Sequence, residues 1–200
     1  MKLYYSRYTR AARPRWVLEE AGAAYELIRV DLKAGDHKQP GYLAVHPHGV
    51  VPALDDGGHR IYESVAICMH LSDKFPEAGL APAPGTPERG WWYQWMLYAV
   101  ATVEAPIAAY ANHTRFLPED RRVAAVAEDA QGKFRHAASN LSHALADREY
   151  LLGAFSSADI VVGSVLMWAA SMGLLTDFPA LDAYLNRLKA RPAWKRSVAD

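Results

Sequence analysis

The residues best suited to chemistry in this chain form two short groups, Val51-Pro52 and Glu63-Ser64. An extended segment that enters a proline can hold a cis X-Pro bond, which turns the N–H and C=O of the preceding residue, here Val51, outward toward a peptide. Ser64 stands where an alternating stretch gives way to an apolar helical run, so it is predicted to be the N-cap of a helix whose N-terminus attracts a carboxylate. Glu63 beside it can take an ammonium group. The two groups together predict a site for a small zwitterionic peptide.

Each group alone also has an ordinary structural interpretation. A proline in a short apolar strand usually marks an edge or a turn, and Glu-Ser before a helix is a common cap. The occurrence of both at this spacing makes the peptide site the more specific interpretation. A peptide with an extended backbone at one end and an amino-acid head at the other is glutathione.

The elements that must position these residues follow from the hydrophobic pattern. Strands are predicted at residues 2–6, 25–31, 51–55 and 60–62, helices at 11–23 and 64–74, and an irregular or helical connection at 37–44. Asp56-Gly57-Gly58 supplies the turn of a hairpin. The order predicts a βαβ unit followed by a ββα unit.

A proline-rich and glycine-rich segment at residues 77–87 predicts a linker between a domain at 1–76 and a domain at 88–200. After it the strand signals vanish. We expect an apolar helix from Glu88 to Tyr110 that Pro106 bends, a helix from Glu119 toward Ala146, and a last helix at 180–190. Ser156 and Asp159 predict a capping box before an uncharged helix, which gives Asp159 a structural role. The second domain is therefore predicted to be all-helical.

On these motifs the sequence resembles the cytosolic glutathione S-transferases over essentially its whole length. The resemblance implies a thioredoxin-like first domain with a cis-proline before its third strand, joined to a helical domain that carries the same Ser-x-x-Asp box. It implies that Val51, next to the cis-proline Pro52, pairs with the cysteinyl backbone of glutathione, and that Glu63 and Ser64 hold the γ-glutamyl head. Reduced glutathione is then a co-substrate. A homodimer is expected from the resemblance and from the wide apolar arc of the helix at 88–110.

Glutathione chemistry needs a thiolate near neutral pH, which a hydroxyl between the first strand and the first helix can stabilise. Pro14 places the start of that helix close to Arg10. Subclasses of the family use a tyrosine at the end of the strand, a serine at the helix start, or a cysteine there. Thr9 matches the serine position and Tyr5 the tyrosine position, whereas Arg10 or a neighbour stands at the cysteine position. We predict Thr9 as the catalytic residue, with Tyr5 as the alternative and Arg10 and Arg13 adding positive potential. The interpretation that Thr9 is only a cap and Tyr5 only a strand side chain stays open.

The sequence identifies two parts of the expected site less directly, the residues that meet the glycyl carboxylate and those of the electrophile pocket. Family members commonly carry Asn-Pro-x-Gly-Lys before Val-Pro, and here Val50 replaces the lysine that meets the glycyl carboxylate. His37 and Lys38, with His48 as a further possibility, are the nearest replacements. The electrophile pocket is expected between the domains, and its candidate residues are Tyr8, Tyr98, Thr102 and Tyr110.

Composition argues against several classes of protein. The chain has 22 Lys and Arg residues and 22 Asp and Glu residues. This balance of charge gives no indication of a basic surface that would bind nucleic acid or an anionic membrane. The start lacks the pattern of a signal peptide and no apolar run approaches the ~18 residues of a membrane span, so a cytoplasmic protein is expected. The single cysteine, Cys68, is expected to be a buried packing residue. His46 and His48 lack a third ligand, so two solvated imidazoles rather than a metal site are expected.

The favoured function is conjugation of reduced glutathione to small hydrophobic electrophiles, as in detoxification. A glutathione-dependent reductase of disulfides or peroxides uses the same thiolate and is an alternative. A non-catalytic glutathione-binding or scaffold protein is another; the intact Val51-Pro52 and Glu63-Ser64 groups argue against it, and the missing lysine leaves it open.

Overall fold

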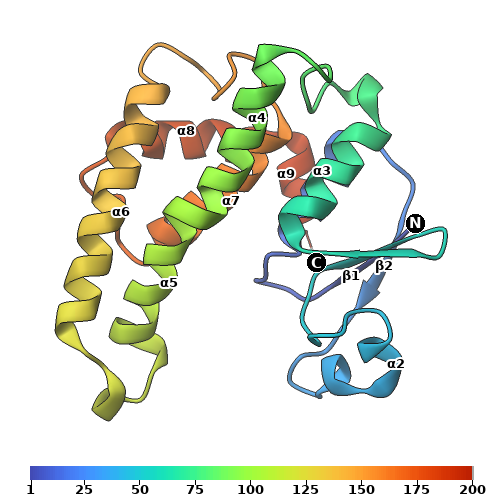
Figure 1. The fold of residues 1–200 in the computed structure, drawn as a ribbon, viewed down its shortest axis with the longest axis horizontal. Coiled ribbons are helices and arrows are strands. Elements are labelled where there is room, and N and C mark those ends of the chain that lie inside the picture. The colour runs from blue at the N-terminus through green and yellow to red at the C-terminus, as the bar shows by residue number, and fades with distance from the viewer. Residues whose placement is uncertain (200) are drawn as a thin grey trace. The chain divides into compact units, whose positions relative to one another are not determined.

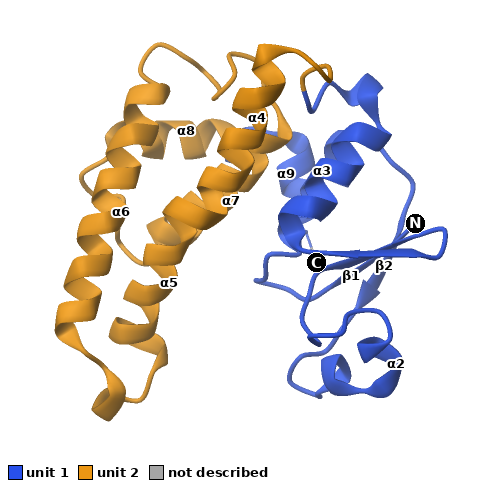
Figure 2. Cartoon of the chain, viewed as in Figure 1, with its two compact units in different colours: residues 1–81, 189–200 blue, residues 82–188 orange. Residues whose placement is uncertain are grey.

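The computed structural model describes residues 1–199, which form two compact units. Unit 1 contains residues 1–81 and the C-terminal segment from residue 189, and unit 2 contains residues 82–188 (Figures 1 and 2). Unit 1 has a mixed sheet with helices and unit 2 is helical. The predicted fold class, a thioredoxin-like part and an all-helical part, is confirmed.

The sheet of unit 1 has the strand order β2-β1-β3-β4. Its strands are β1 (Lys2–Tyr5), β2 (Glu26–Arg29), β3 (Ala53–Asp56) and β4 (His59–Tyr62). β1 and β2 are parallel because the helix α1 (Ala12–Glu20) connects them, whereas β3 is antiparallel to both of its neighbours. Gly57 and Gly58, both with positive φ, form the two-residue turn between β3 and β4. The βαβ-ββα order is as predicted.

Helices cover both faces of this sheet. In Figure 1, α3 (Ser64–Lys74) lies above the strands and α2 (Pro40–Leu43) lies below them. Two short 3₁₀ turns, Asp36–Lys38 before α2 and Pro76–Ala78 after α3, belong to the connecting segments. Successive strand residues point to opposite faces. Leu3 is accordingly fully buried, as are Trp16 on α1 and Ile67 on α3, while Tyr4 meets Tyr42 of α2 with ring centroids 5.7 Å apart.

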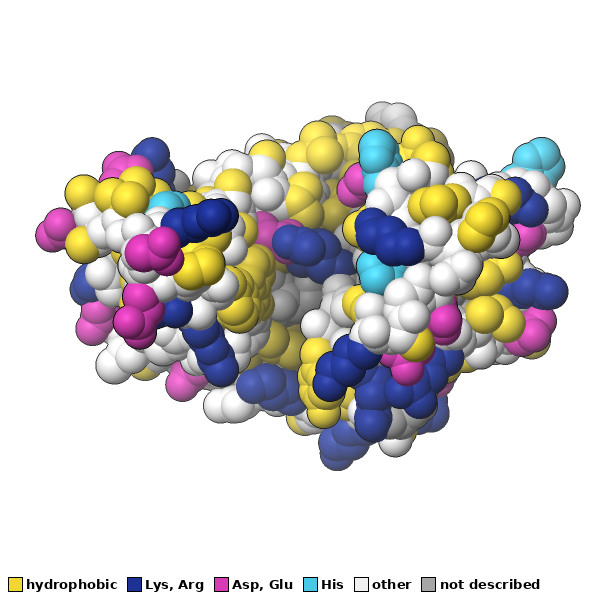
Figure 3. All heavy atoms as spheres, turned by 90° about the horizontal axis from the view of Figure 1, so that it is seen from below, with side chains coloured by type: hydrophobic (Ala, Val, Ile, Leu, Met, Phe, Trp, Pro, Cys, Tyr) yellow, Lys and Arg dark blue, Asp and Glu magenta, His cyan; other side chains and the backbone are white. Residues whose placement is uncertain are grey.

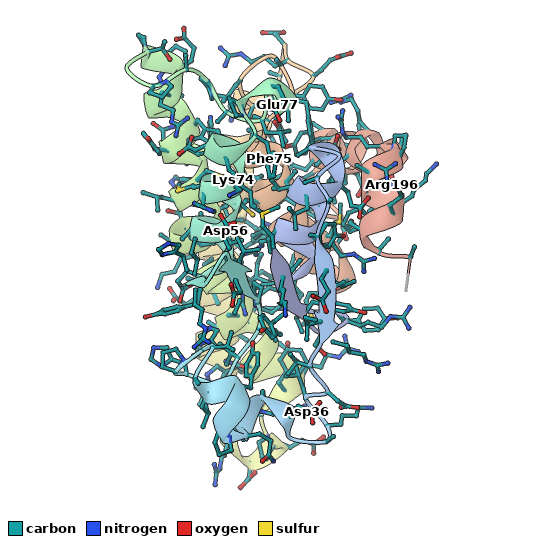
Figure 4. All side chains as sticks on the ribbon, turned by 90° about the vertical axis from the view of Figure 1, so that its right-hand side faces the viewer. Asp36, Asp56, Lys74, Phe75, Glu77 and Arg196 are labelled. Carbon is teal, nitrogen blue, oxygen red and sulfur yellow. The ribbon has the colours of Figure 1, made fainter. Side chains whose placement is uncertain are left out.

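One ionic cluster ties the hairpin to α3. Asp56, at the end of β3, accepts hydrogen bonds from Lys74 Nζ at 2.7 Å and pairs with His70 Nε2 at 2.9 Å. Figure 4 shows Asp56 and Lys74 on adjacent elements. The cluster fixes the turn of the hairpin against the C-terminal half of the helix.

The C-terminal segment differs from the predicted domain division, which put residues 88–200 in one helical domain. A short helix, α9 (Pro192–Ser197), packs on α1 within unit 1. Trp194 packs against Trp16 with the rings tilted and their centroids 4.8 Å apart, and Arg191 Nε pairs with Glu20 at 2.6 Å. A helix of six residues is too short to produce a periodic signal, so the sequence pattern did not indicate it.

Unit 2 is a set of helices with two π segments. Its elements are α4 (Pro87–Tyr98), a π segment (Ala99–Glu104), α5 (Ala105–Ala111), a second π segment (Asn112–Phe116), a 3₁₀ turn (Glu119–Arg121), α6 (Ala124–Ala144), α7 (Ser157–Ser171) and α8 (Pro179–Ala190). The predicted bend at Pro106 takes the form of wider turns just before it, because proline has no N–H to give to an earlier carbonyl. The helix after Pro118 begins as a single 3₁₀ turn, so α6 starts later than predicted.

The capping box of α7 is confirmed. Asp159 is fully buried and accepts hydrogen bonds from the backbone N–H of Ser156 at 2.8 Å and of Leu151 at 3.0 Å, and from the hydroxyl of Tyr184 at 2.8 Å. Burial raises the pKa of Asp159, and these hydrogen bonds oppose that rise. Asp159 thus joins the start of α7 to α8 and to the preceding loop, which is a structural role.

Candidate functional site

One edge of the sheet in unit 1 gathers the segments that the sequence singled out. Tyr4 pairs with Ala53, and Ala53 pairs with Tyr62, so the end of β1, the start of β3 and the end of β4 lie side by side. Val51-Pro52 and Glu63-Ser64 therefore leave the sheet at the same edge. Because β2 is parallel to β1, the connection that contains His37 and Lys38 also begins there.

Val51 precedes a cis peptide bond, as predicted for Val51-Pro52. Its side chain packs against a cluster of buried residues that includes Val30, Tyr42 and Ala53. The hydroxyl of Tyr42 donates to the carbonyl of Val50 at 2.6 Å and so fixes the backbone just before Val51. Within the described part of the chain, neither the N–H nor the C=O of Val51 has a hydrogen-bond partner. These are two backbone groups that an extended peptide can pair with.

The prediction that Ser64 is a helix N-cap is wrong by one residue. Glu63 is the N-cap of α3, with φ +70, and its carbonyl accepts the first intrahelical bond from Ile67. Ser64 is the first helical residue, and its backbone N–H is one of those that a helix start leaves without an intrahelical partner. Glu63 is exposed, and Ser64 is buried. A non-glycine residue in this backbone region is strained, and such strain clusters at functional sites.

Arg13 contacts Ser64, which the sequence did not predict. Its Nη1 donates to the hydroxyl of Ser64 at 3.2 Å, and only 3% of Arg13 and 5% of Ser64 are exposed. The start of α1 is thereby joined to the start of α3. The only signal was the position of Arg13 one turn after Arg10, and nothing in a single sequence shows that the two helix starts meet.

Thr9 lies in the turn that leads into Ala11, the N-cap of α1. The helix begins at Ala12 with Ala11 as N-cap, later than the start that we predicted close to Arg10. The hydroxyl of Thr9 donates to the carbonyl of Ser6 at 2.7 Å and accepts from the N–H of Ala11 at 3.3 Å. The turn therefore holds the oxygen in a fixed place, with its hydrogen directed at the backbone.

The two tyrosines of this segment differ in environment. Tyr5 is half-buried and its ring lies under the guanidinium of Arg15, with 5.5 Å from Cζ to the ring centroid. Tyr8 is fully exposed and has φ +58. Both line a cavity of unit 1. The structure thus gives Tyr5 a fixed cationic neighbour, whereas Tyr8 is exposed at the edge of the cavity.

His37 and Lys38 lie against the segment that leads into Val51. Lys38 Nζ is 3.5 Å from the carbonyl of Gly49, and a Cβ on Gly49 would lie only 2.5 Å from the carbonyl oxygen of His37. Gly49 also has φ +58, so this close approach requires glycine. Within the described residues, the buried Nδ1 of His37 has no hydrogen-bond partner. Figure 3, which views the molecule from below, shows histidine and basic side chains on unit 1.

The prediction of two solvated imidazoles is wrong for His46. Only 2% of His46 is exposed, because its ring packs on Tyr62 with centroids 4.9 Å apart and its Nδ1 accepts from the N–H of His48. Burial, aided by the nearby His48, lowers the pKa of His46. A single sequence did not show that β4 would bring Tyr62 over this loop. His48 itself is exposed, as expected.

Cys68 is fully buried, as predicted, and burial raises its pKa to about 12. Its thiol therefore stays protonated at neutral pH and cannot serve as a thiolate nucleophile.

The remaining pocket candidates belong to unit 2. Tyr98 donates its hydroxyl to the carbonyl of Ala137 at 3.3 Å, and Tyr110 is half-buried. Thr102 is exposed and lines an open cavity of about 790 Å³ between α5 and α6, which also includes Pro106 and His136. Of these three candidates, Thr102 alone lines that cavity.

Across residues 1–199 there is no group of three or more His, Cys, Asp or Glu side chains placed to hold a metal ion. None of the helices found there combines the length and the hydropathy of a membrane span.

Known proteins resemble this chain over its full length. Residues 1–73 match the glutathione S-transferase N-terminal domain and residues 104–192 match the glutathione S-transferase C-terminal domain. Glutathione S-transferase F9 of Arabidopsis thaliana is 30% identical across 100% of this chain and 96% of that protein.

Two solved structures share the fold at the same level of identity. A ternary complex of BphK, a bacterial GST, has a TM-score of 0.87 and 30% identity and covers 100% of this chain and 98% of its own. A sphingomonad glutathione S-transferase complexed with glutathione has a TM-score of 0.86 and 30% identity, with coverage of 100% and 98%. This chain, with its Val-Pro strand entry and its Glu-Ser helix start at one sheet edge, belongs to the glutathione S-transferase family of enzymes.

Proposed function

We propose that this protein binds reduced glutathione and conjugates it to small hydrophobic electrophiles. The observation that carries the proposal is the pair of unpartnered backbone groups on Val51, at the same sheet edge as Glu63 and Ser64. The sphingomonad relative, which shares the fold, was solved in complex with glutathione.

The γ-glutamyl head of glutathione suits the start of α3. Its carboxylate would bind at the hydroxyl and N–H of Ser64, where the positive end of the helix dipole favours an anion. The guanidinium of Arg13, 3.2 Å from the Ser64 hydroxyl, adds a buried positive charge there. Exposed Glu63 would take the ammonium group.

The backbone and the glycyl end of glutathione suit the neighbouring segments. The cysteinyl residue would pair with the N–H and C=O of Val51 in the manner of an added strand. The glycyl carboxylate would meet Lys38 or His37, which lie against Gly49 and stand in for the lysine missing at Val50. This arrangement places the thiol toward the end of β1 and the start of α1.

The chemistry needs the thiol as a thiolate. Thr9, with Tyr5 as the alternative, would donate a hydrogen bond to the sulfur, and the nearby Arg10 and Arg13 favour the negative charge. The thiolate attacks the electrophilic carbon, a C–S bond forms, and the leaving group departs with its bonding electron pair. We further propose a cytoplasmic homodimer that works without a metal and has neither nucleic acid nor membrane as a partner.

Replacement of Ser64 by alanine tests the glutathione site. Ser64→Ala should weaken glutathione binding by roughly 1 to 3 kcal/mol, because a charge-assisted hydrogen bond to a carboxylate is lost from a buried position. Isothermal titration measures the affinity. Ser72→Ala is the matched control, since Ser72 is a buried serine of the same helix whose hydroxyl donates to the carbonyl of Cys68. Unchanged affinity in Ser64→Ala, with the circular dichroism intact, would remove the γ-glutamyl head from Ser64.

A substrate panel separates conjugation from the alternatives. Turnover of an aryl halide with glutathione supports conjugation. Turnover restricted to peroxides or mixed disulfides would assign a reductase, and tight glutathione binding with no turnover would assign a binding or scaffold role.

A further inference from the structure

Unit 1 contains a cavity of about 180 Å³, which Tyr5 and Tyr8 line together with residues that the predicted site does not include. It lies between the segment from β1 to α1, the first turns of α1, and α9, all of which belong to this unit. Its lining includes Tyr5, Ser6, Arg7, Arg15, Trp194 and Ser197. The carbonyl of Ser6 accepts the hydroxyl of Thr9, so the cavity borders the turn that holds the proposed thiol-activating group.

The size and walls of the cavity fit one aromatic ring. A cavity of about 150 Å³ is large enough for benzene, and drug-sized ligands need about 300 Å³ or more. Tyr5 and Trp194 supply aromatic walls, and both rings are anchored: Trp194 by Trp16 at 4.8 Å, and Tyr5 by the guanidinium of Arg15 at 5.5 Å. A single-ring ligand is therefore favoured over a larger one.

The charge of the lining favours an anion. Two arginines, Arg7 and Arg15, line the cavity, and none of the described residues that line it is acidic. The chain has four arginines between residues 7 and 15 and no acidic residue before Glu19. Glu19 pairs with Arg196 at 2.7 Å and Glu20 with Arg191 at 2.6 Å, so these acids of α1 already have basic partners.

Arg7 is the residue best placed to meet an acidic group. It is exposed at the cavity, and within the described residues its guanidinium has neither a hydrogen bond nor an ion pair. Arg15 is buried and donates to the carbonyl of Arg196 at 3.2 Å, which holds it in the wall. A guanidinium fork binds a carboxylate in a bidentate manner.

We propose that this cavity binds an aromatic ring that carries one acidic group. The second substrate of the enzyme is then an anionic aryl electrophile. The proposal rests on the proposed function for the attacking thiolate. With an aryl chloride, the glutathione sulfur attacks the carbon that bears chlorine, a C–S bond forms, and chloride leaves with the electron pair of the C–Cl bond. The acidic group is unchanged and stays at Arg7.

Two electrophiles of equal size test the charge preference. We expect the parent enzyme to accelerate the reaction of 4-chloro-3-nitrobenzoate more than that of the neutral 4-chloro-3-nitrobenzamide, when each kcat/KM is divided by the rate constant of the uncatalysed reaction with glutathione, because the carboxamide activates the ring more than the carboxylate does. Arg7→Gln should lower the benzoate value roughly tenfold, mainly through KM, since one charge-assisted hydrogen-bond pair is lost, and should leave the benzamide value within about twofold. Arg29→Gln is the matched control, because Arg29 is an exposed arginine of unit 1 outside the cavity lining. It should change neither value.

A binding measurement separates this proposal from the proposed function. Titration of 4-nitrobenzoate without glutathione should show binding to the parent and to Arg29→Gln, and roughly tenfold weaker binding to Arg7→Gln. If no aryl chloride is turned over while this binding pattern holds, conjugation fails and the cavity assignment stands. Equal binding to the parent and Arg7→Gln, absence of binding to the parent, or a measurable turnover in which the parent accelerates the two electrophiles equally over their uncatalysed reactions would overturn the assignment.

Discussion

Thr9 gives its single hydroxyl hydrogen to the carbonyl of Ser6, a bond of 2.7 Å within one turn. A thiolate nearby would compete for that hydrogen, and a full negative charge is the stronger acceptor. Tyr5 offers a more acidic hydroxyl, but its ring is fixed in the wall of the cavity under Arg15. The choice between the two residues is therefore a question of which hydroxyl reaches the sulfur.

We predict that Thr9→Val lowers kcat roughly ten- to a thousandfold, the span for losing one positioned donor to a developing anion. Valine keeps the shape of threonine and the backbone surface at Val51, so glutathione binding should survive. Tyr5→Phe should have a much smaller effect. The ultraviolet absorbance of the bound thiolate, followed against pH in the parent and both variants, gives the pKa of the bound thiol. A rise in that pKa in Tyr5→Phe but not in Thr9→Val would assign the enzyme to the tyrosine-using subclasses.

Single residues with strong local signatures were predictable. Val51, Pro52, Glu63 and Ser64 were singled out from spacing and turn chemistry, and the sheet register brings them to one edge, while their role in binding glutathione stays a prediction. The position of the cap was one residue off, because Glu63 takes a positive φ that a sequence rarely reveals. Arg13 and buried His46 depend on contacts between distant segments, which periodicity does not encode.

At the scale of elements, the start of α7 depends on one buried carboxylate. Asp159→Ala would leave the N–H groups of Ser156 and Leu151 and the hydroxyl of Tyr184 without their acceptor. We predict a loss of about 3 kcal/mol or more in the free energy of unfolding, since each buried unsatisfied donor costs about 1 to 3 kcal/mol. Urea unfolding measures it. Asp182→Ala, an exposed acid of α8, should cost less than about 1 kcal/mol; equal losses in the two variants would contradict the structural role of the box.

The cluster of Asp56 with Lys74 and His70 gives the hairpin a pH-dependent attachment. Hydrogen bonds from Lys74 and His70 lower the pKa of Asp56 from 3.8. The folded chain therefore keeps Asp56 ionised at a pH where the unfolded chain has bound a proton, so its contribution to stability is present above pH 3.8 and is lost as the pH falls toward the folded-state pKa.

Asp56→Asn should accordingly lower the free energy of unfolding by about 1 kcal/mol at neutral pH. The difference from the parent should shrink as the pH falls through 3.8. Urea unfolding at several pH values between about 3 and 7 tests this. Glu77→Gln is the control, because Glu77 is an exposed acid just after α3 (Figure 4). A difference between parent and Asp56→Asn that stays constant with pH would show that the ion pairs do not carry the effect.

Elements with complete local signals were predicted well, and those set by packing were not. The bounds predicted for α3, residues 64–74, are those observed, because an apolar period and a following proline agree, although the N-cap is Glu63 rather than Ser64. The π segment before Pro106 could not be foreseen beyond a bend, since its wider turns depend on how the helix accommodates proline. α9 gave no signal of its own and is held by Trp194 on Trp16.

At the scale of the whole molecule, each unit has its own core and presents apolar side chains that the core does not use. In unit 2, α4 buries Trp92 and Met96 completely but leaves 51% of Trp91, 44% of Tyr93 and 57% of Leu97 exposed. Several large apolar residues exposed on one helix are typical of an interaction surface rather than of scattered surface residues.

We therefore predict a two-fold homodimer with α4 in its interface. Light scattering should give about twice the chain mass of 22.1 kDa at micromolar concentration. Leu97→Glu should shift the mass toward that of the monomer, because a carboxylate would be buried without a partner in the interface. Val123→Glu is the matched control: Val123 is 49% exposed and precedes α6 rather than belonging to α4, and the same change there should leave the mass as in the parent. A parent mass near 22.1 kDa across this range of concentration would show that the apolar face of α4 serves another partner or none.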